Sequence, residues 1–175
     1  DRLKLVDDDF MAFAWVLDFP MFEWNETEER WDAAHHPFTM PRPNTYEAMA
    51  ADPSTVLSDA YDLVGNGYEL ASGSIRVHDP EIQTDIFRVL GYSDEDAQAR
   101  FGHMMEAFSY GAPPHGGIAP GIDRLVMLLA GANNIREVIA FPKTAQGTDL
   151  MADAPASVSE RQLEELHLQI RDEDD

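Results

Sequence analysis

The chain has 175 residues, 44% of them hydrophobic, which is enough for one domain of ordinary size with its own core. Its net charge of -21 argues against a primary nucleic-acid-binding surface in this chain, because affinity for nucleic acid depends on neutralising phosphate charges. The absence of cysteine excludes disulfides and thiolate chemistry, and neither a long apolar run nor a signal peptide is visible. We therefore expect a soluble, cytoplasmic protein without a membrane segment, whose reactive groups are carboxylates, histidines and arginines.

The first part of the chain is predicted to form strands and a loop. The apolar run Met11–Leu17 predicts a buried strand, and a second strand is expected at Met21–Trp24. Three prolines within His35–Pro43 exclude a helix there and predict an ordered loop or extended segment. The polar stretch Asn44–Ser54 has room for one short helix.

A β-hairpin is the clearest local prediction. Two β-like runs between Ala60 and Leu70 flank an Asn66-Gly67 pair, which favours a two-residue type I′ turn. Such a turn places Val64 opposite Glu69 and Asp62 opposite Ala71, so that Asp62 and Glu69 become diagonal neighbours on one face. The second strand is expected to continue to His78.

The rest of the chain is predicted to alternate helices and short strands. Apolar spacing and capping residues predict helices at about Pro80–Leu90, from the Ser93 cap towards Phe108, and at Gly121–Ala130. Short strands are expected at Ile118–Ala119 and Val138–Pro142. The fold class is therefore α+β in one domain, residues 1–175, with poorly ordered ends at 1–9 and 169–175.

The two hairpin carboxylates allow two interpretations. Like charges at this range raise each other's pKa unless a cation lies between them, and Mg²⁺ is usually held by one or two carboxylates plus substrate phosphates. Asp62 and Glu69 are thus candidate Mg²⁺ ligands. The alternative is that both are solvated residues on an exposed sheet face.

Arg76 lies seven residues after Glu69, which in a regular strand places the two on opposite faces. A bulge within the small residues Ala71–Ser74 would bring Arg76 to the acidic face, where its planar guanidinium could bind a carboxylate or phosphate. Without the bulge, Arg76 is a structural salt-bridge residue.

Arg124 and the histidine pair are further candidates. Arg124 stands in the first turn of its predicted helix, where the dipole disfavours a cation. Either an anionic ligand at that helix N-terminus or a carboxylate from elsewhere would compensate. The pair His35-His36 either orients a polar substrate or is an ordinary loop feature, and neither histidine has the companions of a zinc site.

Several sequence strings occur in the same order as in a known family. The chain resembles bacterial-type aspartyl-tRNA synthetases of class II from about Phe10 to about Leu168, and the last string below is similar to class II motif 3. The strings are Asp18–Glu23, His35–Thr39, Tyr61–Val64, Gly67–Leu70, Gly73–Arg76 and Gly116–Leu125.

The resemblance implies a fold and a set of site residues. The fold would be part of the class II synthetase core, an antiparallel sheet flanked by helices. Asp62 and Glu69 would hold the Mg²⁺ on ATP, Arg76 would grip the side-chain carboxylate of aspartate, and His35 would contact the bound amino acid. Arg76 and Arg124 would be the catalytic residues. The implied ATP contacts are Glu69, Gly121, Ile122, Asp123 and Arg124.

The resemblance also implies a reaction and partners. The enzyme would be an aspartate–tRNA ligase, in which the α-carboxylate of aspartate attacks the α-phosphorus of ATP. The aspartyl-adenylate formed would then transfer its aspartyl group to tRNA. The implied partners are ATP, L-aspartate, tRNA and, in the full-length enzyme, a second copy as a homodimer.

The chain departs from the family pattern in two respects. Ala71-Ser72 stands where the family is richer in glycine. Motif 1, which builds the dimer, motif 2, which supplies an arginine to the ATP α-phosphate, and the anticodon-binding barrel are not recognisable. The chain is therefore expected to be the C-terminal portion of the catalytic domain, to hold about half of an active site, and to be inactive in isolation.

Three other functions remain open at this point. One is a ligase that charges tRNA for both aspartate and asparagine. The second is a synthetase-like paralogue that binds ATP and an amino acid without charging tRNA. The third is a purely structural acidic domain, which would have no reason to collect Asp62, Glu69, Arg76 and Arg124 in one cleft.

Overall fold

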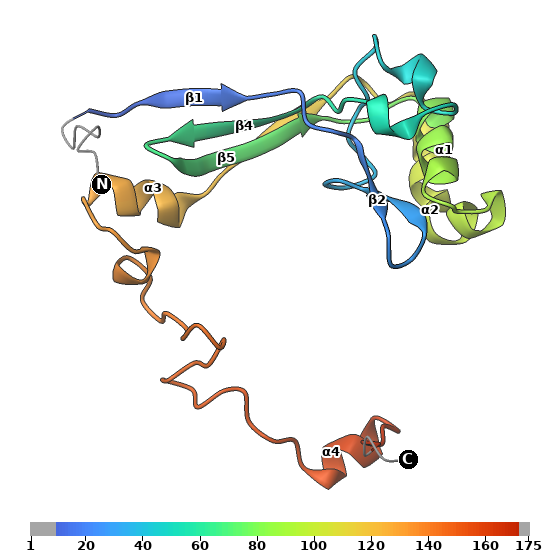
Figure 1. Cartoon of the computed structure of the whole chain (residues 1–175). Helices are drawn as coiled ribbons and strands as arrows, with labels where there is room; N and C mark the ends of the chain where they lie inside the picture. The colour runs from blue at the N-terminus through green and yellow to red at the C-terminus, as the bar shows by residue number, and fades with distance from the viewer. Residues whose placement is uncertain (1–9, 172–175) are drawn as a thin grey trace. The chain divides into compact units, whose positions relative to one another are not determined.

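The computed structural model describes residues 10–171 and confirms the α+β class (Figure 1). The chain divides into two compact units, Asp1–Leu125 and Val126–Asp175. The first unit holds a four-stranded antiparallel sheet in the order β1-β4-β5-β6 and a two-stranded sheet, β2-β3. Of the ends expected to be poorly ordered, 1–9 and 172–175 lie outside the described residues, and 169–171 form neither helix nor strand.

The strands agree with the sequence prediction only in part. The run Met11–Leu17 contains β1, but this strand is exposed and not buried as predicted, because it lies at the edge of its sheet. The second hairpin strand ends at Ile75 and not at His78. The short strand expected near Ile118 is longer than predicted, and the strand that follows Trp24 was not predicted at all. The bounds of the six strands are β1 Phe13–Val16, β2 Phe22–Asn25, β3 Arg30–Ala33, β4 Ala60–Gly65, β5 Tyr68–Ile75 and β6 Gly116–Pro120.

The β4–β5 turn is built as predicted. Asn66 and Gly67 both have positive φ, 49° and 85°, as a type I′ turn requires. The Asn66 side chain has a second use, because its Oδ1 accepts a hydrogen bond of 2.8 Å from the Ala12 backbone N–H. The backbone N–H of Asn66 in turn donates to the Ala12 carbonyl at 3.0 Å. The turn thus also fixes the start of β1.

The helices begin at the residues that the capping signals indicate. Asp79 caps α1 (Pro80–Val89), and Ser93 caps α2 (Asp94–Ser109) as predicted. The single short helix expected between Asn44 and Ser54 is replaced by two 3-10 turns, η1 (Tyr46–Ala48) and η2 (Pro53–Thr55). Asp52 separates them, because its side chain caps the turn that starts at Pro53.

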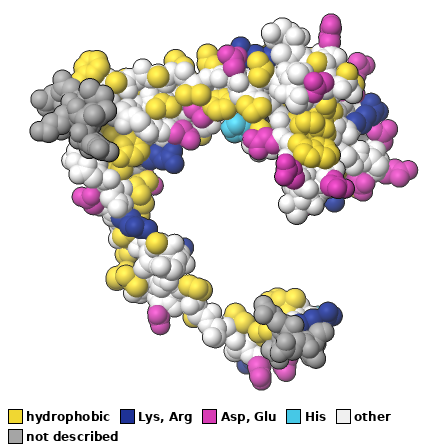
Figure 2. Space-filling model, viewed as in Figure 1, with side chains coloured by type: hydrophobic (Ala, Val, Ile, Leu, Met, Phe, Trp, Pro, Cys, Tyr) yellow, Lys and Arg dark blue, Asp and Glu magenta, His cyan; other side chains and the backbone are white. Residues whose placement is uncertain are grey.

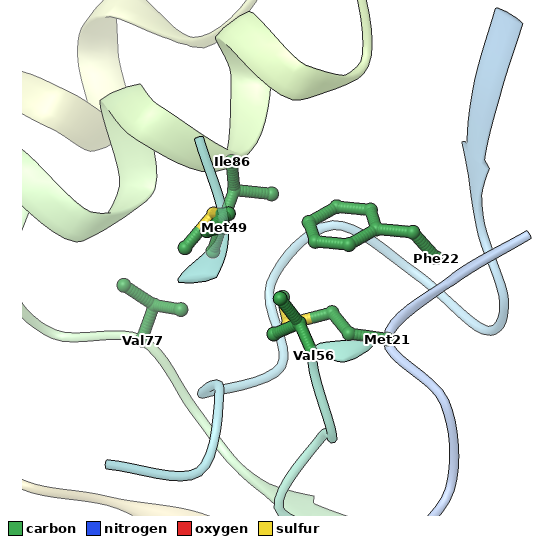
Figure 3. Close-up of a cluster of buried hydrophobic side chains, with 6 residues drawn as sticks. All are labelled: Met21, Phe22, Met49, Val56, Val77 and Ile86. Atoms are coloured by element: carbon green, nitrogen blue, oxygen red, sulfur yellow. The ribbon is translucent and has the colours of Figure 1, made fainter. Parts of the chain in front are cut away.

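A cluster of buried side chains joins β2 to α1 (Figure 3). Ile86 of α1 and Val56 are fully buried at its centre, and Val77, just after β5, is 1% exposed. The other members are Met21, Phe22 and Met49. This cluster anchors the helix pair to the segments that leave the four-stranded sheet, so it fixes the end of β5 at which Arg76 lies.

The outer strands of the four-stranded sheet are uncovered. Every residue of β1 and of β6 is exposed, including Trp15 at 57% and Ile118 at 46%. Hydrophobic side chains are visible along the sheet in Figure 2, and acidic ones gather around the α1–α2 end. Within residues 10–171, every helix is too short or too polar to cross a membrane.

The second unit has little regular structure. It contains the end of α3 (Ile122–Leu129), the 3-10 turn η3 (Ile135–Glu137) and α4 (Glu160–Glu165). The strand predicted at Val138–Pro142 is wrong: the Val138 N–H instead closes η3 by bonding to the Ile135 carbonyl at 3.2 Å. Among the described residues this apolar segment has no ladder partner, and a strand needs one.

The buried cluster predicts the effect of a cavity mutation. Replacing Ile86 with alanine should lower the free energy of unfolding by about 3 kcal/mol, since buried large-to-small changes lose both transfer free energy and packing. The matched control is Leu129→Ala, at a side chain that is 74% exposed, which should cost less than about 0.5 kcal/mol. Urea unfolding followed by tryptophan fluorescence measures both, and equal losses would contradict the assignment of this core.

Candidate functional site

A β-bulge at Leu70 decides which residues share a face of the hairpin. Val64 pairs with Glu69, but Leu63 pairs with Ala71, so Leu70 is one extra residue on β5. Asp62 therefore lies opposite Ser72, and the predicted pairing of Asp62 with Ala71 is wrong. Asp62 and Glu69 nevertheless share a face of the hairpin, as predicted. Glu69 lies opposite Val64, and Asp62 is two residues before Val64 on β4, so all three side chains point to the same side.

The bulge also corrects the parity of Arg76. Ser72 faces Asp62, and Arg76 follows four residues later, so Arg76 belongs to the same face as Asp62 and Glu69. The bulge was predicted within Ala71–Ser74 and is found one residue earlier. Gly73 is not part of the bulge, but it leaves room for a contact across β5. The Tyr61 hydroxyl donates a hydrogen bond of 3.0 Å to the Gly117 carbonyl, and a Cβ on Gly73 would collide with that carbonyl.

The carbonyls around the bulge hold the start of α3. The Leu70 carbonyl accepts a hydrogen bond of 2.7 Å from the Gly121 N–H. The Glu69 carbonyl accepts one of 2.7 Å from Arg124 Nη1, which is also 3.6 Å from the Glu69 carboxylate oxygen Oε1. The first turn of α3, with the exposed residues Ile122 and Asp123, is thereby tied to the acidic end of β5.

Arg124 is thus paired with Glu69 across an open surface. The two side chains are 44% and 51% exposed, and an ion pair of this exposure contributes little to stability. Such a pair reorganises at low cost when a stronger anion arrives. Both interpretations of Arg124, an ion pair and an anion-binding residue at a helix N-terminus, are therefore compatible with one arrangement.

Arg76 is fixed at the other end of β5 by backbone on both sides. Its N–H donates to the His115 carbonyl at 2.9 Å, and Arg76 forms a β-bridge with Thr39. The flanking bonds run from the Val77 N–H to the Phe38 carbonyl at 3.0 Å and from the Met40 N–H to the Ile75 carbonyl at 2.8 Å. The proline-rich segment is therefore extended, as predicted, and adds an antiparallel partner beyond β5.

His36 contacts the Arg76 side chain directly. Nη1 of Arg76 lies 3.1 Å from Nδ1 of His36 and also contacts Nε2. A neutral imidazole has one nitrogen that can accept from a guanidinium, whereas a protonated one has none and repels it. His36 therefore orients Arg76 only in its neutral form.

The remaining predicted residues are placed as follows. His35 is exposed, and its ring lies edge-on to Phe19 with the centroids 5.1 Å apart. Asp62, on β4, is half-buried and lies opposite Ser72, in the middle of β5. Glu69 and Arg76 are separated along the strand by on the order of 20 Å, as seven residues of β-strand span. The site is therefore an elongated surface with one arginine at each end.

The carboxylates fit a Mg²⁺ ion only in part. Asp62 and Glu69 supply hard oxygen ligands on one face, but among residues 10–171 no three acidic or histidine side chains gather as a metal cluster. Two carboxylates alone leave most of the Mg²⁺ coordination shell to phosphate and water.

A cavity of about 650 Å³ lies away from these residues. It is lined by residues of β3, η1 and α1, among them Trp31, Tyr46, Asp85 and Arg88. None of the predicted site residues lines it, and the candidate site is an open face of the sheet instead.

The sequence analysis missed the partner of Arg76. The histidine pair was singled out, with His35 as the expected ligand contact, while the contact to Arg76 is made by His36. These two residues are forty positions apart, so only the pairing of Thr39 with Arg76 brings them together.

Comparisons with known proteins identify relatives along nearly the whole chain. The family model described as tRNA synthetases class II (D, K and N) matches residues 2–145. The chain is 56% identical over 169 residues to the aspartate–tRNA ligase of Macrococcus caseolyticus, covering 97% of the chain and 28% of that protein. It is 57% identical over 170 residues to the aspartate–tRNA(Asp/Asn) ligase of Rubrobacter xylanophilus, with coverages of 97% and 28%.

A solved structure gives the same result for the fold. The aspartyl tRNA synthetase from Entamoeba histolytica matches with a TM-score of 0.55 at 29% identity, covering 77% of this chain and 23% of that one. The chain spans less than a third of the length of the curated relatives it matches.

The His36–Arg76 contact predicts a pH dependence of stability. Burial of the ring, the Arg76 guanidinium and neighbouring His35 lower the pKa of His36 below its ordinary value of 6.5. At pH values below 6.5, His36 is therefore protonated more readily in the unfolded chain than in the folded chain. The contribution of His36 to the free energy of unfolding is fully present above pH 6.5 and is lost as the pH falls below it. Between about pH 7.5 and about pH 5.5 the wild-type chain should lose more stability than His36→Asn.

Asparagine is a suitable replacement because its side-chain oxygen can accept from the Phe38 N–H, which His36 Nδ1 now does at 3.2 Å. Urea midpoints at the two pH values measure the difference. Acidic side chains elsewhere titrate equally in both proteins, so identical losses would show that His36 is not held neutral in the folded state.

Proposed function

The chain belongs to the class II tRNA synthetases (D, K and N), and on this basis we propose that it supplies part of the active site of an aspartate–tRNA ligase. The observation that carries the proposal is the bulged hairpin, which aligns Glu69, Asp62 and Arg76 on one face and ties Arg124 to its acidic end. The names of the relatives support aspartate as the amino acid. The 175 residues are proposed to be the C-terminal portion of the catalytic domain.

Arg76 is proposed to bind the side-chain carboxylate of aspartate. A guanidinium offers two parallel N–H donors that match a carboxylate, and the neutral His36 beside it leaves the positive charge of Arg76 uncompensated. Since His36 and Arg76 form no ion pair with each other, an incoming carboxylate does not have to displace one from this contact. His35, exposed next to them, is proposed to contact the bound amino acid.

The acidic end of β5 is proposed to receive ATP. Gly121, Ile122, Asp123 and Arg124 lie at the start of α3, and a helix N-terminus is a favourable place for a phosphate. The Gly121 N–H is already bonded to the Leu70 carbonyl, so the proposed donors are the N–H groups of Ile122 and Asp123 and the Arg124 side chain. Glu69 and Asp62 would hold Mg²⁺, which when bound neutralises phosphate charge. In this arrangement the exposed Arg124–Glu69 pair opens, and each side chain finds a ligand of opposite charge.

The proposed reaction needs positioning more than covalent work by the protein. An oxygen of the aspartate α-carboxylate bonds to the α-phosphorus of ATP while the bond from that phosphorus to pyrophosphate breaks, giving aspartyl-adenylate. The aspartyl group then passes to the terminal adenosine of tRNA, and AMP leaves. Arg76 and Arg124 hold the two ends of the reacting pair, which lowers the entropic part of the barrier.

The proposal extends to the complete protein. Its partners would be ATP, L-aspartate, tRNA and a second copy as a homodimer, and its place would be the cytoplasm. The relatives differ in whether their names include asparagine tRNA, so the proposal concerns activation of aspartate. The arginine that motif 2 supplies in this family is not recognisable in the 175 residues, so we expect no charging by this stretch in isolation.

Two arginine substitutions test the assignment in the complete protein that contains this chain. Arg76→Met should reduce kcat/KM for aspartate in ATP–pyrophosphate exchange by on the order of 100-fold while KM for ATP stays within about twofold, because a charge-assisted pair with the substrate is lost. Arg124→Met should show the converse, a raised KM for ATP with little change for aspartate.

Arg88→Met is the matched control, because Arg88 lies on α1, forms surface ion pairs with Asp85 and Asp94, and has no part in the proposed site. Circular dichroism checks that each variant is folded. Equal effects of Arg76→Met on aspartate and ATP, or none on either, would refute the proposed division of roles.

A further inference from the structure

One buried polar side chain has no part in the chemistry proposed above. Gln83, on α1, is 0% exposed, and its Nε2 donates a hydrogen bond of 2.8 Å to the Pro37 carbonyl. Its Oε1 is buried without a hydrogen-bond partner among residues 10–171. A buried amide with one unsatisfied oxygen costs stability, so a core position filled by packing alone would favour an apolar residue.

The hydrogen bond from Gln83 falls at the peptide next to His36. Pro37 has no N–H of its own, and its carbonyl lies between the residue that contacts Arg76 and Phe38. Phe38 is held on both sides: its carbonyl accepts from the Val77 N–H, and its N–H donates to His36 Nδ1. The bond from α1 therefore completes the fixation of the short segment that carries His36.

The same helix pair holds Phe38 by its ring. Phe38 lies edge-on to Phe87 of α1, with centroids 6.5 Å apart, and to Phe101 of α2 at 5.8 Å. Phe87 and Phe101 stack on each other at 4.7 Å. Gln83 is one turn before Phe87 on the same face of α1. The hydrogen bond from Gln83 therefore holds Pro37, and the ring of Phe87 contacts the next residue, Phe38.

We propose that Gln83 is a positioning residue for Arg76: through the Pro37 carbonyl it fixes the place of His36, and His36 fixes the direction of the Arg76 guanidinium. This inference rests on the proposed function only where it takes the aspartate carboxylate as the ligand of Arg76. That Gln83 positions His36 is inferred from the hydrogen bonds of the Pro37–Phe38 segment alone.

The substitution Gln83→Met separates positioning from stability. Methionine has a similar length and volume, and it removes both the donor to Pro37 and the unsatisfied buried oxygen, so the fold should persist. The matched control is Tyr46→Phe, which removes a hydrogen bond of the same length, 2.8 Å, between Tyr46 and Asp85 on the same helix. That bond does not reach the His36 segment.

In the complete protein, ATP–pyrophosphate exchange at varied aspartate and ATP gives the first readout. Gln83→Met should raise KM for aspartate about threefold to tenfold, the effect of one lost hydrogen bond, and leave kcat and KM for ATP within about twofold. On a His36→Asn background the same substitution should add less than about twofold, because the two residues act in series. Tyr46→Phe should change none of these values.

The titration of His36, followed by NMR of the histidine ring protons, gives a second readout that needs no activity. Gln83→Met should move the pKa of His36 upwards, towards the ordinary value of 6.5, since the ring is freed from burial beside Arg76. Tyr46→Phe should leave it unchanged.

The outcomes distinguish this inference from the proposed function. An unchanged His36 titration in Gln83→Met, or kinetic effects of Gln83→Met and His36→Asn that multiply, would overturn the role of Gln83. Absence of aspartate-dependent exchange in the wild-type protein would instead overturn the proposed function, and the titration would still decide the claim about Gln83.

Discussion

The single extra residue in β5 is the constraint on which the site depends. Because Leu70 has no partner on β4, Glu69 and Arg76 lie on the same face of the sheet, whereas in a regular strand they would lie on opposite faces. The same bulge turns the carbonyls of Glu69 and Leu70 towards the start of α3, where Arg124 and Gly121 donate to them. One local irregularity thus sets both the order of charges along the strand and the position of the helix N-terminus beside it.

The two ends of β5 are organised by different means. At the acidic end, Arg124 and Glu69 form an exposed pair that exchanges partners at low cost. At the other end, Arg76 is held by backbone bonds and by a neutral His36, which α1 fixes through Gln83 and Phe38. Although the chain has a net charge of -21, it has an arginine at each of the two positions where anionic groups of substrates are proposed to lie, Arg76 and Arg124.

Local signals in the sequence predicted the local structure, and long-range contacts limited the rest. The Asn66-Gly67 turn and the Ser93 cap were confirmed because each depends on a few adjacent residues. The bulge was expected but misplaced, since its position is decided jointly with the bond from Gly121, some fifty residues later. The predicted strand at Val138–Pro142 failed because an apolar run forms a strand only beside a partner, and the contact of His36 with Arg76 could not be read from either segment separately. The resemblance to bacterial aspartyl-tRNA synthetases is confirmed by the relatives.

The most direct test of the account is a crystal structure of the complete protein with a non-hydrolysable aspartyl-adenylate analogue. We expect the analogue to lie along β5, with its aspartyl side-chain carboxylate within hydrogen-bonding distance of the Arg76 guanidinium and its nucleotide end at Arg124. We also expect Glu69 and Arg124 to separate from each other in that complex. An analogue bound without contact to Arg76, or bound on another face of the sheet, would contradict the central claim that the Leu70 bulge assembles the site.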